Sequence, residues 1–331
     1  MPSHGLLWVS FGCLACLALG GGLMAPSLQT DSPGIPIGIS VLVPIPEQNP
    51  WTWEKAELGR RLFFDQGLSR DGSISCASCH NVERAFTDGN AKPFGVDAQQ
   101  GRRNVPSLVN CAFQKSLFWD GRRASLEEQA LDPIENPTEL GNNLGRAIHF
   151  LESEAEYAAM FEQAFGTPRV TSQRIAKAIA SYERTLFSGN TPFDRYSILG
   201  DESALTAAAL RGLNLFMGRA RCSHCHEPPL FTDHRFHNTG VSWGMRPLDL
   251  GRYEHSGQPE DKGKFKVPSL RDVSLTAPYM HDGSMATLEE VIEFYSRGSN
   301  SNPNLDQTLQ PLNLTPSDKT DLVVFLNSLT M

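Results

Sequence analysis

Two short runs of sequence, Cys76-Ala77-Ser78-Cys79-His80 and Cys222-Ser223-His224-Cys225-His226, decide how this chain is interpreted. In a Cys-x-x-Cys-His motif the two thiols add to the vinyl groups of a haem, and the adjacent histidine is an axial ligand of the iron. A thioredoxin-like redox pair and half of a zinc site are the alternatives, but a zinc ribbon needs its second cysteine pair much closer in sequence. We therefore predict two covalent haem c groups, with His80 and His226 as axial iron ligands.

The composition is that of a globular protein long enough for two domains, with 331 residues, of which 40% are hydrophobic and 20% charged. The net charge of −8 argues against a nucleic-acid partner and would suit a basic redox partner. Four of the seven cysteines belong to the motifs, Cys13 and Cys16 lie in an apolar N-terminal stretch, and Cys111 is expected to be a small buried hydrophobic residue. No disulfide framework is indicated.

The apolar run from Leu6 to Leu19 is too short to span a bilayer and is followed by glycines, as expected of a secretory signal. We expect a signal peptide over residues 1–25 and a periplasmic protein, because bacterial c-type haems are attached outside the cytoplasm. No Lys or Arg precedes the run, so an uncleaved anchor and a lipidated Cys16 stay open. Residues 26–50 are predicted to be a Pro-rich linker with no core of its own, and no other segment could cross a membrane.

The two motifs lie inside a repeated unit. An apolar stretch with helical spacing precedes each motif, at 57–64 and at 210–217. From Val105 onward, the sequences align without a gap at a constant offset of 162, which carries Val105 to Val267, Trp119 to His281 and Leu126 to Leu288. This duplication predicts a mainly α protein made of two cytochrome c-like helical domains, each of which binds one covalent c-type haem.

We expect an N-terminal haem domain over residues 51–200 and a C-terminal haem domain over residues 201–331. Apolar residues from Ile175 to Leu186 form one helical stripe, and residues 204–217 form a helix that leads into the second motif. A final helix should begin after Thr315 as N-cap, with Pro at its first position, and run to about residue 329.

The same offset predicts that the two haems are unlike. Tyr295 lies on an amphipathic helix in the C-terminal half, and its counterpart in the N-terminal half is Pro133, which has no side-chain atom able to bind iron. Likewise Gln129 stands where the C-terminal half has Val291. One iron should therefore have a protein ligand on both faces, and the other should be open on one face beside polar groups.

The chain resembles the bacterial di-haem cytochrome c peroxidase and MauG family from about Trp51 to Leu329. The resemblance rests on the two Cys-x-x-Cys-His motifs and on residues 103–107, 118–122 and 278–284, which read RNVPS, FWDGR and PYMHDGS. It implies that the N-terminal haem is the peroxidatic site, where hydrogen peroxide reacts, and that the C-terminal haem is the electron-transfer site.

The resemblance also implies roles for single residues. Trp119 would relay electrons between the haems, rather than serve only as a packing residue. Glu139 would move a proton between the peroxide oxygens, rather than only begin a surface helix. Gln129 and Pro133 match residues of the distal pocket, the space on the open side of the peroxidatic iron.

A calcium site is a further implication of the resemblance. Asn104 and the backbone carbonyls of Thr276 and Pro278 match a Ca²⁺ site between the domains. All three offer oxygen donors, which a hard cation prefers.

Two departures from the activation-requiring peroxidases favour the MauG-like branch. Those enzymes carry a His some sixteen residues after the first motif that closes the resting site, and residues 87–101 here contain no His. Their second haem has a Met ligand, whereas Tyr295 occupies the place where MauG uses Tyr; Met280 is the rival ligand. A MauG feature is also missing, because Ala220 replaces the electron-hopping Trp that MauG has two residues before its second motif.

These features together predict a periplasmic di-haem peroxidase or oxidase. Its electrons would come from a small cytochrome or cupredoxin, or from Trp or Tyr residues of a protein substrate that is being modified. The alternative is a non-catalytic di-haem electron-transfer cytochrome, which would have no use for the open pocket around Gln129, Pro133 and Glu139.

Overall fold

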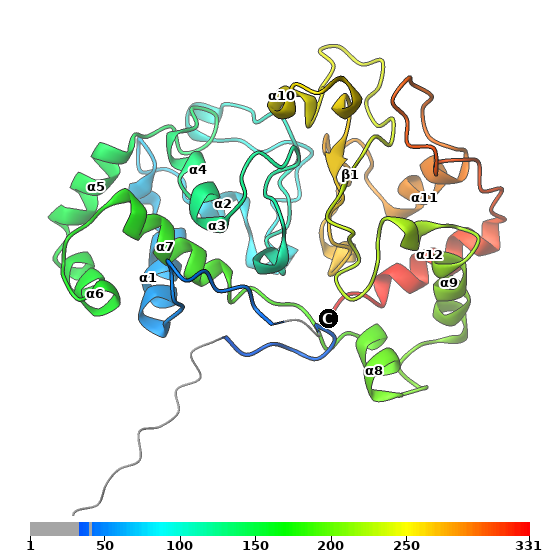
Figure 1. Ribbon diagram of the computed structural model, residues 1–331, viewed down its shortest axis with the longest axis horizontal. Helices are drawn as coiled ribbons and strands as arrows, with labels where there is room; N and C mark the ends of the chain where they lie inside the picture. The colour runs from blue at the N-terminus through cyan, green and yellow to red at the C-terminus, as the bar shows by residue number, and fades with distance from the viewer. Residues whose placement is uncertain (1–32, 40–41) are drawn as a thin grey trace, which may run out of the picture. The chain divides into compact units, whose positions relative to one another are not determined.

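A computed structural model describes residues 33–39 and 42–331 of the chain (Figure 1). The expected signal peptide, with Cys13 and Cys16, lies outside these residues. The fold is mainly helical, and no helix in the described part of the chain is long and apolar enough to cross a bilayer. The helices are α1 Trp53–Phe63, α2 Cys76–Cys79, α3 Leu126–Gln129, α4 Asp132–Glu135, α5 Leu144–Ser153, α6 Ala155–Phe165, α7 Ser172–Glu183, α8 Pro192–Leu199, α9 Ala207–Met217, α10 Tyr253–Ser256, α11 Leu288–Ser296 and α12 Pro316–Asn327.

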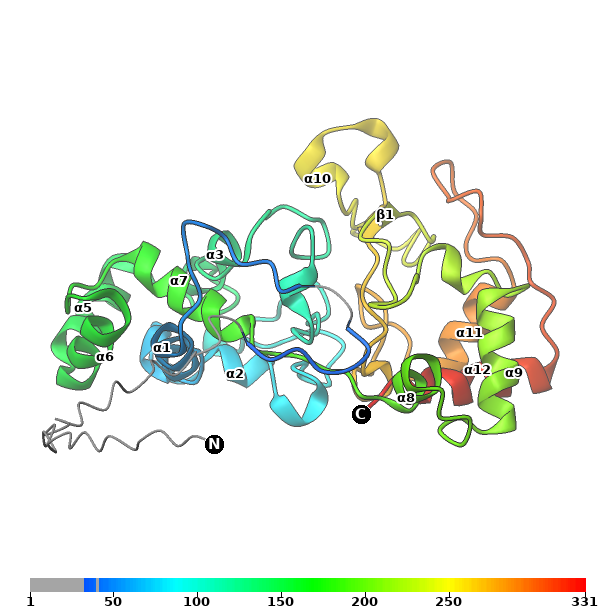
Figure 2. The same ribbon diagram turned by 60° about the horizontal axis from the view of Figure 1, so that its bottom comes forward.

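Each half is built around one crossed pair of helices, α1 with α7 and α9 with α12 (Figures 1 and 2). The crossings are close because each contains a glycine. A Cβ on Gly59 would lie 1.9 Å from the carbonyl oxygen of Ala178, and one on Gly212 would lie 2.0 Å from that of Asp321. The same turn of each pair carries an aromatic contact: the rings of Phe63 and Tyr182 are 5.2 Å apart, and those of Phe216 and Phe325 are 5.1 Å apart. The helix pairs thus repeat residue by residue, which supports the predicted duplication.

The loops after each motif repeat as well. A backbone bridge joins Leu117 to Arg123 in the first half, and one joins Tyr279 to Met285 in the second, at the offset of 162 (279 − 117 and 285 − 123). The Ser107 hydroxyl donates to the carbonyl of Ala85 at 2.6 Å, and the Ser269 hydroxyl donates to that of Leu230 at 2.6 Å. The sequence alignment therefore describes the three-dimensional register correctly.

The repeat breaks where Pro133 replaces Tyr295. In the second half α11 runs unbroken over nine residues through Tyr295. In the first half the corresponding segment is two single turns, α3 and α4, and Pro133 lies in the first turn of α4. Proline has no N–H to bond the carbonyl four residues earlier and its ring crowds that turn, so the helix cannot continue through this position.

The two halves meet through a reciprocal pair of backbone hydrogen bonds. Asn104 N–H donates to the carbonyl of His281 at 2.8 Å, and Lys266 N–H donates to the carbonyl of Trp119 at 2.8 Å. Asn104 and Lys266 are equivalent positions of the repeat, as are Trp119 and His281. The contact is thus self-complementary, like the interface of a two-fold dimer. Lys266 belongs to β2, Phe265–Lys266, which pairs antiparallel with β1, Phe236–His237.

The structure corrects the prediction that residues 26–50 are a linker with no core of its own. In the part of this segment that is described, Ile39 is 4% exposed and Val43 is 9% exposed, and both pack against Phe113 and Leu230. A stretch that buries apolar side chains against both halves is part of the folded body.

The boundary between the halves also differs from the predicted one. Phe193 of α8 packs into the core of the second half with Phe216, Phe231 and Phe325. Asp194, next to it, forms a fully buried ion pair with Arg271 at 2.6 Å. Helix α8 therefore belongs with the second half, and not with residues 51–200. Helices α9 and α12 match the predicted ones closely, with Thr206 and Thr315 as N-caps.

Candidate haem-binding active site

The two motif histidines are held in the same way. His80 Nδ1 lies 2.8 Å from the carbonyl oxygen of Phe86, and His226 Nδ1 lies 2.9 Å from that of Phe231. Both phenylalanines adopt a positive φ, of 59° and 55°, which turns the chain back toward the histidine. Burial lowers the pKa of both imidazoles, so each is neutral with its proton on Nδ1. Each Nε2 therefore keeps a lone pair, which is the arrangement that an iron ligand requires.

Three of the four motif thiols lack the lowered pKa of a redox-active cysteine pair. Burial raises the pKa of Cys76, Cys79 and Cys222 to about 12, so these thiols are neutral at ordinary pH. A thioredoxin-like cysteine needs a lowered pKa, which these thiols do not have. Both cysteine pairs line one continuous cavity of about 800 Å³, whose walls are mostly apolar. This donor set and its surroundings fit haem.

All of the predicted site residues line this cavity. In the first half these are Gln129 at the end of α3, Pro133 on α4 and Glu139 in the loop that follows. Asn136 Nδ2 donates to Glu139 Oε1 at 2.6 Å, which fixes the carboxyl group. Burial raises the pKa of Glu139, while Asn136 and Arg122 act in the opposite direction. The result is a held carboxyl group able to accept and return a proton.

In the second half, both candidates for the outer iron ligand reach the cavity. Tyr295 is presented by the unbroken helix α11. Burial raises the pKa of its phenol, and the Thr239 side chain opposes that shift. Met280 lies in a turn with φ of 73°. The structure places both side chains at the cavity, so their assignment depends on the spectra of variants.

Trp119 lies where the two halves meet. Its Nε1 donates to the backbone carbonyl of Asn104 at 2.8 Å, and its ring centroid is 6.4 Å from that of His281, edge to face. His281 is in turn stacked on Phe265 at 3.6 Å. Trp119 therefore has a fixed orientation beside aromatic groups of the other half.

The candidate calcium donors also face the cavity from both halves. Asn104 is buried, and its Nδ2 donates to the carbonyl of Asn90 at 2.9 Å, so its Oδ1 is turned the other way. Thr276 and Pro278 come from the second half. Oxygen donors from both halves are compatible with a hard cation there.

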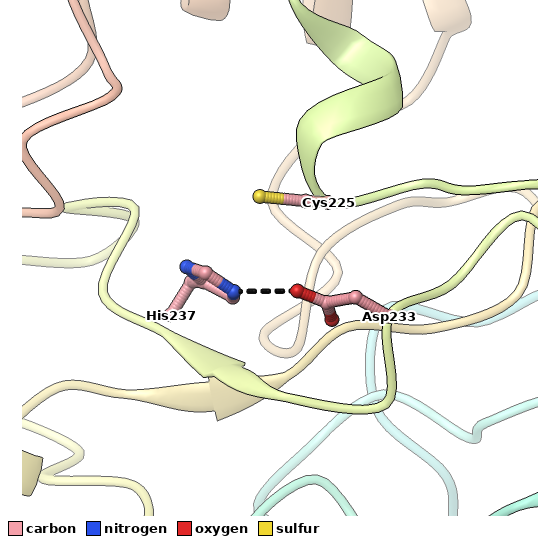
Figure 3. A group of neighbouring side chains, drawn as sticks. All are labelled: Cys225, Asp233 and His237. Carbon is pink, nitrogen blue, oxygen red and sulfur yellow. Dashed lines mark hydrogen bonds and ion pairs between the residues drawn. The ribbon is translucent and has the colours of Figure 1, made fainter.

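One cluster with the composition of a metal site was not anticipated from the sequence. Cys225, Asp233 and His237 come together beside the second motif (Figure 3). His237 Nε2 lies 2.9 Å from Asp233 Oδ2, and its Nδ1 pairs with Asp306. Hydrogen bonds to Cys225, Asp306 and Asp233 raise the pKa of His237. Joining the sulfur of Cys225 to a haem would remove its contribution, but the two carboxylates would still favour the protonated ring. Both ring nitrogens of His237 are engaged by carboxylates, so we interpret this cluster as an ion-paired histidine.

The two helical halves of this chain line one continuous cavity. The family model for di-haem cytochrome c peroxidase matches residues 53–203. The methylamine utilization protein MauG of Methylorubrum extorquens is 40% identical over 87% of this chain and 81% of that protein. Cytochrome-c peroxidase IdrP1 of Denitromonas iodatirespirans is 38% identical over 98% of this chain and 92% of that protein.

A solved structure is similar as well. The crystal structure of a MauG-like protein associated with microbial copper homeostasis aligns with a TM-score of 0.80 at 35% identity, over 92% of this chain and 95% of that one. The chain belongs to the di-haem cytochrome c peroxidase and MauG family, and it is a di-haem oxidoreductase.

Proposed function

We propose that the chain carries two covalent haem c groups and uses hydrogen peroxide as oxidant at the site of His80. The observation that carries this proposal is the asymmetry of the repeat. In the first half Pro133 stands where the second half has Tyr295 on a continuous helix, and the held carboxyl group of Glu139 lies six residues farther along the chain. A protein that only carries electrons needs no such unligated polar pocket.

When bound, the haem groups would supply redox-active iron, at which the oxygen–oxygen bond of a peroxide can be broken. Glu139 accepts the proton of one peroxide oxygen and returns it to the other, so that the leaving oxygen departs as water. Gln129 offers an amide that hydrogen-bonds the peroxide and orients it. Pro133 keeps the pocket free of a protein ligand.

Trp119 connects the two haem sites in this proposal. Its indole is held by Asn104 on the first side and lies against His281 on the second. Electrons from the site of His226 reach the site of His80 through it. We further propose that Tyr295 binds the second iron, that Asn104, Thr276 and Pro278 bind Ca²⁺, and that the protein is exported to the periplasm.

We propose two alternative electron donors, because the relatives include proteins named MauG and proteins named cytochrome-c peroxidase. One is a small cytochrome or cupredoxin that delivers electrons singly. The other is a protein substrate that loses electrons from Trp or Tyr. Ala220 stands where MauG has its hopping Trp, so a MauG-type substrate would have to donate by another route.

Turnover of hydrogen peroxide by the purified holoprotein tests the proposed function. With a reduced small cytochrome or cupredoxin in excess, we expect each peroxide consumed to oxidise two donor molecules, followed by stopped-flow absorbance. Without a donor, the oxidised protein should persist until a protein substrate is supplied, whose modified Trp or Tyr is then found by mass spectrometry. A protein that exchanges electrons with the donor but leaves peroxide untouched would be the non-catalytic carrier.

A further inference from the structure

Besides Glu139, one more carboxyl group lines the cavity on the side of the first haem, that of Glu183. The repeat has no carboxyl group at the equivalent position of the second half. The helix crossings align Ala178 of α7 with Asp321 of α12, since each meets the glycine of its partner helix. Five residues farther along each helix stand Glu183 (178 + 5) and Leu326 (321 + 5). Both line the cavity, as do Ile179 and Leu322 one turn earlier. Glu183 thus occupies a position that is leucine in the other half.

Glu183 has no partner that would explain a buried acid. The residue is 3% exposed, and its Oε2 is enclosed with no hydrogen-bond partner in the described part of the chain. The guanidinium of the adjacent Arg184 is committed to Glu127, at 2.7 and 3.1 Å. Burial raises the pKa of Glu183 to about 8, with Arg184 acting in the opposite direction.

The other ionisable groups around Glu183 leave it free to exchange a proton. On α1, Glu57 and Arg60 pair with each other at 2.7 Å. The thiol of Cys111 is kept neutral by burial, and that of Cys76 is consumed by haem attachment. The remaining neighbour is Tyr182, whose phenol is neutral because burial raises its pKa. Lys266, whose pKa burial lowers to about 8, is close to Cys111 and donates to Gln114 and Ser116.

We propose that Glu183 is a redox-linked proton site of the peroxidatic haem: its carboxylate binds one proton when the iron held by His80 takes up one electron. The physical reason is electrostatic, because an added electron removes positive charge from the site and makes a nearby carboxylate less favourable. On oxidation the electron and the proton leave together. Leu326 gives the second haem no such group. This inference rests on the proposed function, which it deepens.

A consequence is that the two haems respond differently to pH. Above the pKa of Glu183 in the oxidised protein, the midpoint potential of the first haem should fall as pH rises, because reduction then requires proton uptake. The potential of the second haem should change less over the same range. Electron transfer from the second site to the first is therefore favoured at lower pH.

Spectroelectrochemical titration of each haem between pH 6 and pH 10 tests the proposal, with the range set by the pKa of about 8. Glu183→Gln and Glu183→Leu should flatten the pH dependence of the first haem and raise its potential at high pH, since the carboxylate charge is gone. Leu326→Glu, the matched reverse change, should make the second haem pH-dependent. Glu139→Gln should leave unchanged the part of the first haem's pH dependence that is due to Glu183.

A first-haem potential that does not change with pH in the wild type, or a pH dependence in Glu183→Gln as steep as that of the wild type, would overturn the proposal. If the variants fail to fold, redox-induced infrared difference spectra of the wild type decide. A carboxyl C=O band that gains intensity on reduction and persists in Glu139→Gln supports the proposal, and the lack of any such band contradicts it. Haem content and peroxide turnover of the wild type are measured in parallel, so that a failure of the proposed function is recognised separately.

Discussion

Replacing Glu139 by Gln is expected to lower the turnover number with hydrogen peroxide by about 100- to 10,000-fold, the usual contribution of a positioned general acid–base group. Gln has nearly the same shape and can still bond to Asn136, but it cannot take the proton of one oxygen and return it to the other. Peroxide should still enter the pocket, so the loss should appear in kcat more than in KM. Steady-state peroxide consumption measures both constants.

Glu135→Gln is the matched control, because Glu135 is an exposed acid on α4, four residues before Glu139. Its activity should equal that of the wild type. In the wild type, kcat/KM should fall on the acid side at a pH above the ordinary range of a glutamate, because burial raises the pKa of Glu139. A Glu139→Gln protein with unchanged turnover would remove this residue from the proposed chemistry.

The second large effect concerns the outer ligand of the second iron. Tyr295→Phe deletes the phenol oxygen and keeps the ring, so the second haem should change from low-spin to high-spin in the ferric protein. Met280→Leu preserves the volume of the side chain and should leave that spectrum unchanged. Electron paramagnetic resonance of the oxidised proteins separates the two cases.

The reverse result, a silent Tyr295→Phe and a high-spin Met280→Leu, would make Met280 the ligand. The expected reduction potential depends on this assignment. An anionic phenolate stabilises ferric iron and gives a low potential, whereas methionine raises it. With Met280 as the ligand, the protein would resemble the peroxidases that accept electrons through a Met-ligated haem. Sharing of oxidising equivalents between the two sites would then be disfavoured.

The features that sequence could predict are those that recur in the duplication. The offset of 162 set Pro133 against Tyr295, and the structure has a broken helix at the first position and a continuous helix at the second. The caps of the last helix were also readable, because Thr315 and Pro316 are strong local signals. Periodicity and motifs act over short distances, so they survive without a knowledge of tertiary contacts.

What could not be predicted depends on contacts between distant residues. Nothing near His237 in the sequence indicates that Asp306 would pair with it. The packing of Ile39 and Val43 was missed because the proline-rich composition of this stretch suggested a linker, while both side chains are buried between segments far along the chain. The lack of a charged partner for Glu183 could not be predicted either, because it depends on the pairing of the Arg184 guanidinium with the distant Glu127.

The spin state of the fully oxidised holoprotein tests the central claim, that one iron is open and the other closed, most directly. Electron paramagnetic resonance of the ferric protein should show one high-spin and one low-spin haem, and peroxide added without any prior reduction should change the spectrum at once. This follows because residues 87–101 offer no His to close the first site. Two low-spin haems, with a reaction that appears only after half-reduction, would contradict the account.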